Sequence, residues 1–400
     1  MGSPSRIKVG IFFNARRQQG GLYQYALTLV DCLYRFVPEF NYRLYHATLE
    51  EFPLELSGAN WKIFRLARRA IQIRLLEEAV LLSAARVGVG LPFALVTEFS
   101  EIKRDLPDLM LYVKPGVHPF QWKYKAIFPI HDLQHRLQPD FPEVSKNGEY
   151  RRREYFYTRS IQRASAILTD SETGKDDVVS CYGVKKESIF PVPYIAPTFR
   201  NTDGQPSPTE YIRGKYSLPV QYLFYPAAFW KHKNHARLVQ AISLLAQEKN
   251  VRIPLVLAGS KREEYANIAF LVKSLGLGDI VHFIGYVPDE DMADLYQHAL
   301  ALVMPTFFGP TNIPVLEAWG SECAVITSDL RGIREQVGDA GLLVDPRSEH
   351  AIAEAIWSLY QFPNLRRELI ARGKTRVMEW TPEKFAFKLA SAIRYSHSHR

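Results

Sequence analysis

The chain has 400 residues, of which 47% are hydrophobic and 23% are charged, and its formal net charge at pH 7 is +8. This composition is typical of a folded globular protein and excludes a largely disordered chain, and the length predicts two domains of roughly 200 residues each. The positive charge favours anionic partners such as a nucleotide, a lipid phosphate or an acidic membrane. We expect no nucleic acid, because the sequence has no zinc-ligand spacing, no recognition-helix signature and no basic and aromatic repeat.

The three cysteines, Cys32, Cys181 and Cys323, are odd in number and far apart in the chain. Such cysteines are typical of reduced, buried thiols in a cytosolic protein. The first residues show no charged segment followed by an apolar one, and no apolar run reaches the ~18 residues that a spanning helix needs. We therefore predict a cytoplasmic protein, and we leave open a peripheral position on the inner face of the plasma membrane.

The first half of the chain alternates apolar runs with helical patterns, which predicts a parallel sheet. Residues 7–13 form a continuous apolar run, as expected of a buried strand, and the runs at 109–113, 126–130 and 167–170 are similar. Ser171 follows the last of these runs, and we expect it to cap the next helix.

Residues 61–82 are the most basic segment for which the sequence predicts a helix. Lysines and arginines are interleaved there with Trp61, Phe64 and several leucines and isoleucines. Such a helix suits an anionic membrane surface, with Trp61 and Phe64 inserted among the lipids. The equal alternative is a core helix with a solvated basic face.

His131 and Asp132 directly follow the predicted strand at 126–130. Open α/β sheets bind ligands at the carboxyl ends of their strands, so this imidazole is placed to donate a hydrogen bond to a ligand hydroxyl. A structural pair of histidine and aspartate is the alternative, and it is the commoner one.

In the second half, Lys231 and Lys233 stand just ahead of a predicted helix, after a predicted strand at 222–226. Two compact positive charges at a helix start can bind a diphosphate. The alternative is a pair of solvated surface lysines, which is the more frequent case.

A second turn of interest follows the apolar run at 301–304, which predicts a buried strand. The chain then turns and enters a helix that carries Glu317 in its first turns. The turn is made by Gly309, Pro310, Thr311 and Asn312. Free amide N–H groups at such a helix start can hold a phosphate, although an ordinary strand-to-helix turn has the same shape.

The run from 305 to 329, PTFFGPTNIPVLEAWGSECAVITSD, resembles the donor-site signature of family 4 glycosyltransferases, which are retaining enzymes of the GT-B fold. Most of that family has two glutamates separated by seven residues. Glu317 matches the second glutamate, whereas Gly309 stands where the first is expected. The Gly-Pro-Thr-Asn-Ile-Pro version is similar to a mannosyl- or rhamnosyltransferase-like branch, and it leaves open which group binds the sugar hydroxyls.

The resemblance extends to the lysine pair. Residues 229–235 are similar to the family's Arg-x-x-x-x-Lys phosphate segment, with Lys233 at the position of the lysine. Ala228 stands at the position of the arginine, and we expect Lys231 to supply the missing charge.

The resemblance also implies roles for residues elsewhere in the chain. His131 is implied to contact the donor sugar, and Glu317 to accept the ribose of the nucleotide. The remaining implied donor contacts are Gly20 and Gly21 in a loop facing the phosphates, and Tyr286 and Val287 around the base.

With this resemblance, we predict an α/β protein of the GT-B fold, in which two Rossmann-like domains face each other across a cleft. Residues 1–200 are expected to bind the acceptor and residues 217–380 the nucleotide-sugar, with a linker at 198–216. The resemblance further implies that a terminal helix within 381–400 crosses back to the first domain.

The implied reaction moves a hexose or deoxyhexose, mannose or rhamnose-like, from a nucleoside diphosphate sugar to a saccharide or lipid-linked saccharide in surface polysaccharide synthesis. Family members are thought to retain configuration by front-face displacement, in which a phosphate oxygen takes the acceptor proton. No metal ion and no cofactor besides the donor are therefore expected, and the sequence has no Asp-x-Asp motif in a suitable loop. A nucleotide-sugar epimerase and a noncatalytic nucleotide-sugar-binding scaffold are the alternatives.

Overall fold

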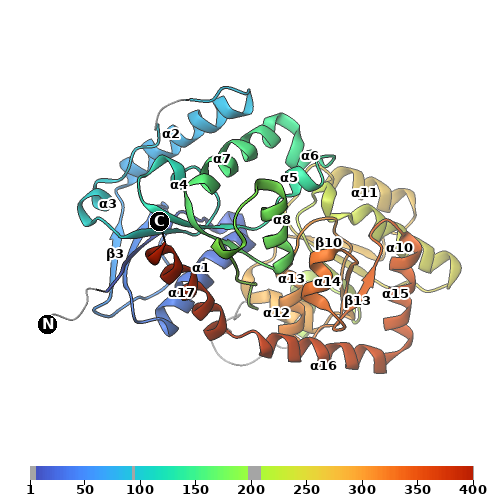
Figure 1. The fold of residues 1–400 in the computed structure, drawn as a ribbon. Coiled ribbons are helices and arrows are strands. Elements are labelled where there is room, and N and C mark those ends of the chain that lie inside the picture. The colour runs from blue at the N-terminus through green and yellow to red at the C-terminus, as the bar shows by residue number, and fades with distance from the viewer. Residues whose placement is uncertain (1–5, 92–94, 197–208, 400) are drawn as a thin grey trace. The chain divides into compact units, whose positions relative to one another are not determined.

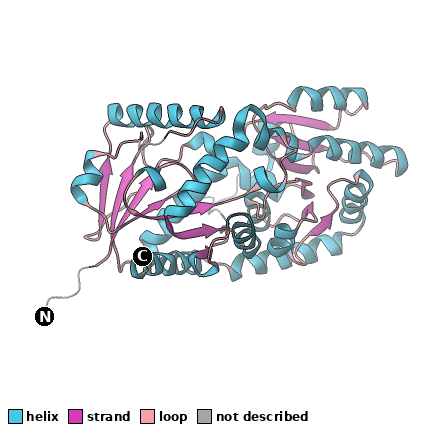
Figure 2. Cartoon of the chain, turned by 45° about the horizontal axis from the view of Figure 1, so that its top comes forward, coloured by secondary structure: helices cyan, strands magenta, loops and turns pink. Residues whose placement is uncertain are grey.

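The computed structural model describes residues 6–91, 95–196 and 209–399. The chain divides into two compact units, the first comprising Met1–Tyr194 with Pro382–Arg400 and the second comprising Ile195–Thr381. Each unit contains one parallel sheet with helices packed against it (Figures 1 and 2). The prediction of two Rossmann-like α/β domains is confirmed.

The first unit is built on a seven-stranded sheet in the order β3-β2-β1-β4-β5-β6-β7, with every neighbouring pair parallel. Its central strands are buried because their sequences are continuously apolar and helices cover them. The strands are β1 (Lys8–Phe13), β2 (Asn41–His46), β3 (Trp61–Arg65), β4 (Leu109–Tyr112), β5 (Lys125–Ile130), β6 (Ala164–Thr169) and β7 (Ile189–Pro191). The four apolar runs of the first half are therefore strands, as predicted.

The helices of this unit include the last helix of the chain. They are α1 (Gly21–Phe36), α2 (Arg68–Arg86), α3 (Ser100–Asp105), α4 (His118–Gln121), α5 (Gln134–Leu137), α6 (Pro142–Ser145), α7 (Glu149–Arg163), α8 (Glu172–Tyr182) and α17 (Pro382–Ser398). The predicted cap of α8 is confirmed, because Ser171 Oγ accepts a hydrogen bond from the Gly174 backbone N–H at 2.9 Å. Helix α17 packs on α1 and against β5, β6 and β7, and Lys125 Nζ donates to the His397 carbonyl at 2.8 Å.

Residues 61–82 are not one helix, so the sequence prediction was wrong there. Trp61–Arg65 is the edge strand β3, and α2 begins only at Arg68. Trp61 and Phe64 each stack on a tyrosine of β2, with ring centroids 4.3 and 5.1 Å apart. Such cross-strand aromatic pairs stabilise a sheet, which explains why the aromatic end of the segment is extended. These two rings therefore belong to the sheet and are not membrane anchors.

The second unit has a six-stranded sheet in the order β10-β9-β8-β11-β12-β13, again with all pairs parallel. The strands are β8 (Leu223–Pro226), β9 (Leu255–Ala258), β10 (Val281–Gly285), β11 (Ala301–Met304), β12 (Val325–Ser328) and β13 (Leu342–Val344). The helices are α9 (Thr209–Tyr216), α10 (His235–Glu248), α11 (Tyr265–Ser274), α12 (Asp289–Gln297), α13 (Ile313–Gly320), α14 (Arg331–Val337), α15 (Glu349–Gln361) and α16 (Pro363–Glu379).

The linker predicted at 198–216 is corrected in its last part. Residues 197–208 lie outside the described residues, and Thr209–Tyr216 forms helix α9. Ile212 of this helix is buried, and the Lys215 ammonium contacts the Asp291 carboxylate of α12 at 2.6 Å. The Tyr216 hydroxyl donates to the same carboxylate. The polar composition hid the helix, because most of its residues are polar and its partner lies far along the chain.

In each sheet the strand order reverses once along the chain, between β1 and β4 in the first unit and between β8 and β11 in the second. Open α/β sheets bind ligands at the carboxyl ends of the strands at such a reversal. The loop after β8 carries Lys231 and Lys233, and the loop after β11 carries Gly309 to Asn312. The fold therefore brings the two candidate phosphate-binding segments to one place.

Candidate functional site

The lysine segment after β8 is held in a defined shape. Lys231–Lys233 forms a short 3₁₀ helix, and Asn234 follows it with a φ of 61° before α10 begins. Asn234 Nδ2 donates to the carbonyls of Pro305 and Pro346 at 2.8 and 2.7 Å. Lys231 is exposed and Lys233 is half-buried. Asn234 thus ties the lysine segment to the end of β11.

His232, between the two lysines, makes a second tie to the loop after β11. Its carbonyl accepts hydrogen bonds from the Phe307 N–H at 2.8 Å and from Thr306 Oγ1 at 3.2 Å. Its imidazole stacks on Phe308, with ring centroids 4.2 Å apart and planes 9° from parallel. The sequence predicted the two lysines as a pair, and the structure shows that His232 and Asn234 hold their segment against the other loop.

Helix α14 fixes the turn from Gly309 to Asn312 at two points. A Cβ added to Gly332 would meet Pro310 Cα and lie 2.6 Å from the Pro310 carbonyl oxygen, so only glycine allows this close approach. The Gln336 side chain binds the backbone of Asn312 twice, accepting from its N–H at 2.8 Å and donating to its carbonyl at 2.9 Å. The turn is therefore rigidly positioned.

These contacts correct one detail of the predicted phosphate cradle. Pro310 has no N–H to donate, and the Asn312 N–H is already bonded to Gln336. In this conformation, neither residue can therefore offer a phosphate the free backbone amide that the sequence had led us to expect.

Glu317 lies on α13, which begins directly after this turn. Tyr296 of α12 donates its hydroxyl to Glu317 Oε2 at 2.7 Å. Burial raises the pKa of Glu317 to about 7, an effect that the Tyr296 hydrogen bond opposes and the charge of Asp289 reinforces. The side chain is half-buried, so a ligand can reach its carboxyl group. Tyr296 is a site residue that the sequence did not reveal.

Tyr286 and Val287 follow β10 and differ in exposure. The Tyr286 side chain is 74% exposed, whereas Val287 is buried. Only the backbone of Val287 can therefore face a ligand, while Tyr286 offers both its backbone and its ring. Their contact with a base stays a prediction.

In the first unit, His131 sits at the carboxyl end of β5 with one ring nitrogen engaged. Its Nδ1 shares a hydrogen bond of 2.7 Å with the Tyr194 hydroxyl, and the Tyr25 ring packs edge-on at 4.8 Å. Burial lowers the pKa of His131 to about 4, against the opposing charge of Asp132, so the imidazole is neutral at pH 7. Among the described residues its buried Nε2 has no partner, which suits the predicted role as a ligand contact.

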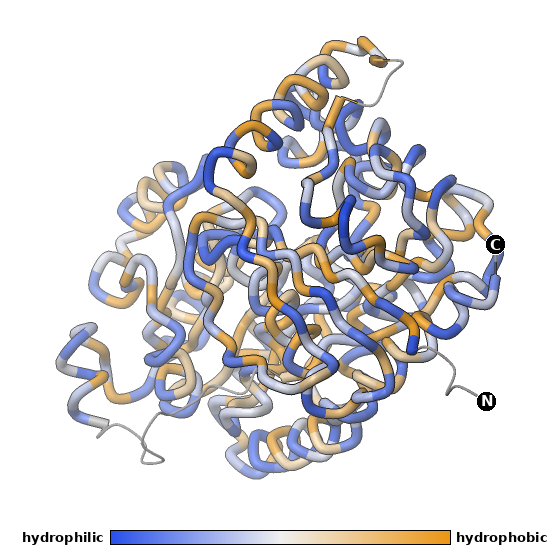
Figure 3. The backbone as a smooth tube through the Cα atoms, turned by 90° about the vertical axis from the view of Figure 1, so that its left-hand side faces the viewer, coloured by the Kyte–Doolittle hydropathy of each residue, from blue (hydrophilic) through white to orange (hydrophobic). Residues whose placement is uncertain are grey.

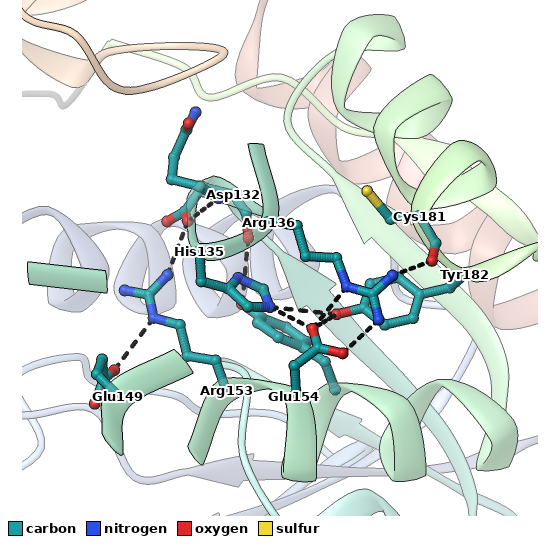
Figure 4. A network of polar contacts seen from close by, with 10 residues as sticks. Asp132, His135, Arg136, Glu149, Arg153, Glu154, Cys181 and Tyr182 are labelled. Atoms are coloured by element: carbon teal, nitrogen blue, oxygen red, sulfur yellow. Dashed lines mark hydrogen bonds and ion pairs between the residues drawn. The ribbon is translucent and has the colours of Figure 1, made fainter. Parts of the chain in front are cut away.

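A polar network that no motif in the sequence predicted supports the loop after His131 (Figure 4). Asp132 pairs with Arg153 of α7 at 2.9 Å, and Arg153 also contacts Glu149 at 3.2 Å. Beside them, Glu154 accepts hydrogen bonds from the Tyr182 hydroxyl at 2.8 Å and from Arg136, and it contacts His135. The network joins α5, α7 and α8 and holds the histidine loop in place.

Gly20 and Gly21 stand at the start of α1, which follows β1, one of the two strands at the reversal in the first unit. Gly20 has a φ of 55°, which favours glycine, and no heavy atom lies within 4 Å of a Cβ built on it. The start of α1 is therefore exposed backbone, and its predicted contact with phosphate remains untested.

Two features are absent from the part of the chain that the structure describes. No group of three or more His, Cys, Asp or Glu side chains is arranged to hold a metal ion there. None of the helices in the described ranges combines the length and apolarity that crossing a membrane requires.

Residues 213–376 match the family model for glycosyl transferases group 1. O-antigen chain mannosyltransferase B of Escherichia coli is 29% identical over 295 residues, which are 73% of this chain and 75% of that protein. O-antigen chain mannosyltransferase RfbU of Salmonella typhimurium is 27% identical over 236 residues, and the chain spans only 61% of its length.

A solved structure shows the same fold over nearly the whole chain. The structure of Anabaena Alr3699/HepE in complex with UDP and glucose has a TM-score of 0.66 and 14% identity, covering 97% of this chain and 99% of that one. The predicted GT-B fold is confirmed by such matches, and at this identity the likeness extends to the fold alone.

Proposed function

We propose that this chain, a glycosyltransferase with a group 1 domain over residues 213–376, transfers mannose from a nucleoside diphosphate to a saccharide in surface polysaccharide synthesis. The observation that carries the proposal is the joining of the two loops after β8 and β11. These contacts hold the segment with Lys231 and Lys233 beside the loop that leads to Glu317. All of these residues lie within the matched residues 213–376. Mannose is favoured by the two mannosyltransferase relatives, which also argue against an epimerase.

In the proposed complex, Lys231, Lys233 and the backbone amide of Gly309 bind the diphosphate. Glu317 accepts a hydrogen bond from the ribose, and the base lies against Tyr286 and the backbone of Val287. When the glycosidic bond breaks, negative charge grows on the leaving diphosphate. Positive groups held beside that charge stabilise the transition state more than the ground state. This difference in stabilisation lowers the barrier and accelerates transfer.

The proposed chemistry retains the configuration of the sugar and needs no enzyme base. The acceptor hydroxyl attacks the anomeric carbon on the face from which the diphosphate departs, and a diphosphate oxygen takes its proton. The neutral His131 acts as a hydrogen-bonding group for the sugar, which agrees with an imidazole whose low pKa keeps it uncharged. Metal-independent transfer is part of the proposal.

The proposal predicts donor binding that depends on the lysine segment. Purified protein is screened for thermal stabilisation by GDP, UDP and dTDP and by their mannose or other hexose derivatives; a ligand at 100 times its Kd stabilises by about 2.7 kcal/mol. We expect one nucleotide to shift the melting temperature, and Lys233→Ala to abolish the shift. No shift with any nucleotide would refute the function, and binding without transfer to any saccharide or lipid-linked saccharide would favour a scaffold.

We further propose that α2 rests on an anionic membrane, where a lipid-linked acceptor is found. Four apolar side chains of α2 and its end share one face, at spacings of three, four and seven residues, and all are exposed. They are Ile73 (42%), Leu76 (67%), Val80 (50%) and Val87 (71%). Arg68 and Arg69 are exposed at the start of the same helix, and Figure 3 shows polar and apolar colours along it. An apolar stripe beside basic residues is typical of interfacial helices.

Sedimentation with lipid vesicles tests this surface. Vesicles with anionic lipid should bind the protein and neutral phosphatidylcholine vesicles should not, and the double variant Leu76→Gln, Val80→Gln should lose the binding. Val220→Gln is a matched control, because Val220 is 75% exposed in the second unit. Equal binding of the double variant and the control would refute the role of α2.

A further inference from the structure

Asn312 carries a buried side-chain amide whose nitrogen has no partner. The residue is 7% exposed, and among the described residues no group accepts a hydrogen bond from its Nδ2. Burying a hydrogen-bond donor without an acceptor is costly, so native proteins rarely keep one unless a ligand or water completes it. This unsatisfied amide stands at the start of α13, in the same loop that the lysine segment contacts through Thr306 and Phe307, and it is therefore a candidate ligand-binding group.

The Asn312 side chain does not cap the helix that follows it. Asn312 is the N-cap of α13, a position where asparagine usually accepts a hydrogen bond from the first turn. Here the side chain makes no such bond. Gln336 holds the backbone of Asn312 by both its N–H and its carbonyl, so the side chain is presented in a fixed place without serving the helix.

The amide lies against Gly309. A Cβ built on Gly309 would be 2.9 Å from Asn312 Nδ2 and 3.0 Å from Oδ1. Gly309 also has a φ of 104°, in the region that glycine adopts and other residues rarely do. The Asn312 amide therefore packs directly against the backbone of Gly309, and the turn has no room for a side chain at position 309.

We propose that the Asn312 amide binds a hydroxyl group of the donor sugar, which deepens the proposed function and rests on it. An amide offers a donor and an acceptor side by side, and a hydroxyl group also donates and accepts, so the two are complementary. A phosphate only accepts, and it is better served by the lysines of the neighbouring segment. Asn312 is thus a specificity-determining residue that recognises the sugar, while the lysines recognise the diphosphate.

The experiment compares the affinity of two ligands for the wild type and for Asn312→Ala by calorimetry. The ligands are the nucleoside diphosphate alone and the same nucleotide carrying mannose. We expect the variant to bind the mannose derivative about tenfold more weakly and the free diphosphate unchanged, since one lost hydrogen bond to a neutral group is worth about that factor. Asn267→Ala, an exposed asparagine of α11 in the same unit, is the matched control.

A second variant and a set of modified donors keep the test decisive. Asn312→Asp keeps the shape but removes the N–H donor, and it should weaken mannose binding if the alanine variant does not fold. Mannose donors that each lack one hydroxyl group are compared with the complete donor. For one of them, the loss of the hydroxyl group should weaken binding to the wild type but leave binding to Asn312→Ala unchanged. Equal weakening of both ligands, or of neither, would overturn the proposal, whereas a wild type that binds no nucleotide would instead overturn the function itself.

Discussion

Donor binding should release a proton from Glu317, and the size of this effect follows from the structure. Burial raises the pKa of Glu317 to about 7 in the free protein, so about half of the molecules carry a protonated Glu317 at pH 7. A ribose hydroxyl that donates to the carboxylate favours its charged form and lowers its pKa. If the pKa falls by about 2 units, binding at pH 7 releases about half a proton, and binding at pH 9 releases almost none.

Calorimetry in two buffers with different ionisation enthalpies measures the number of protons released. The apparent binding enthalpy at pH 7 should differ between the buffers in proportion to that number, and the difference should vanish at pH 9. Affinity should also fall as the pH is lowered below 7, because the carboxyl group must then be deprotonated at a cost in free energy. Glu317→Gln is the control, since it cannot titrate. Proton uptake, or the same release from the glutamine variant, would refute the assignment of Glu317 to the ribose.

Two further predictions concern residues that shape the site. Gly332→Ala should lower the free energy of unfolding by about 1–3 kcal/mol in a urea titration, because a Cβ there meets the Pro310 backbone. Gly278→Ala is the control: no heavy atom lies within 4 Å of a Cβ built there, so the free energy of unfolding should change little. Tyr296→Phe should raise the pKa of Glu317 further, because it removes the hydrogen bond that lowers it, and proton release on donor binding at pH 8 should then increase. An unchanged pH dependence would contradict this second prediction.

The elements of both units could be predicted where one short-range signal dominates. A buried parallel strand must be apolar along its whole length, so the runs at 7–13 and 301–304 predicted β1 and β11 directly. Ser171 predicted the start of α8, because a hydroxyl at that position satisfies a free N–H group. The order of the strands was not predicted and comes from the structure.

The errors occurred where distant contacts decide local structure. Residues 61–65 resemble a helix by composition, but stacking on the tyrosines of β2 makes them a strand. Residues 209–216 resemble a linker, but Ile212 enters the core and the helix docks on α12. In both cases the deciding partner lies about 20 or more residues away, which no periodicity in the segment itself can show.

The same distinction explains how much of the candidate site the sequence revealed. The charged residues Lys231, Lys233 and Glu317 could be found from motif and spacing, because their chemistry is local. Tyr296 and Gln336 could not, because an ordinary tyrosine and glutamine acquire their roles only from the turn and helix that they contact.

Positions 309 and 312 are best understood together. A glutamate placed at position 309 would not restore the family's usual pattern in this chain, because its Cβ would meet the Asn312 amide and its backbone would have to keep a φ of 104°. The turn that excludes a side chain at position 309 is the one that Gln336 and Gly332 hold in place, and it presents the side chain at position 312 instead. The glycine at position 309 and the position of the Asn312 amide are therefore two consequences of one loop conformation, and the sugar contact that we propose lies three residues beyond position 309.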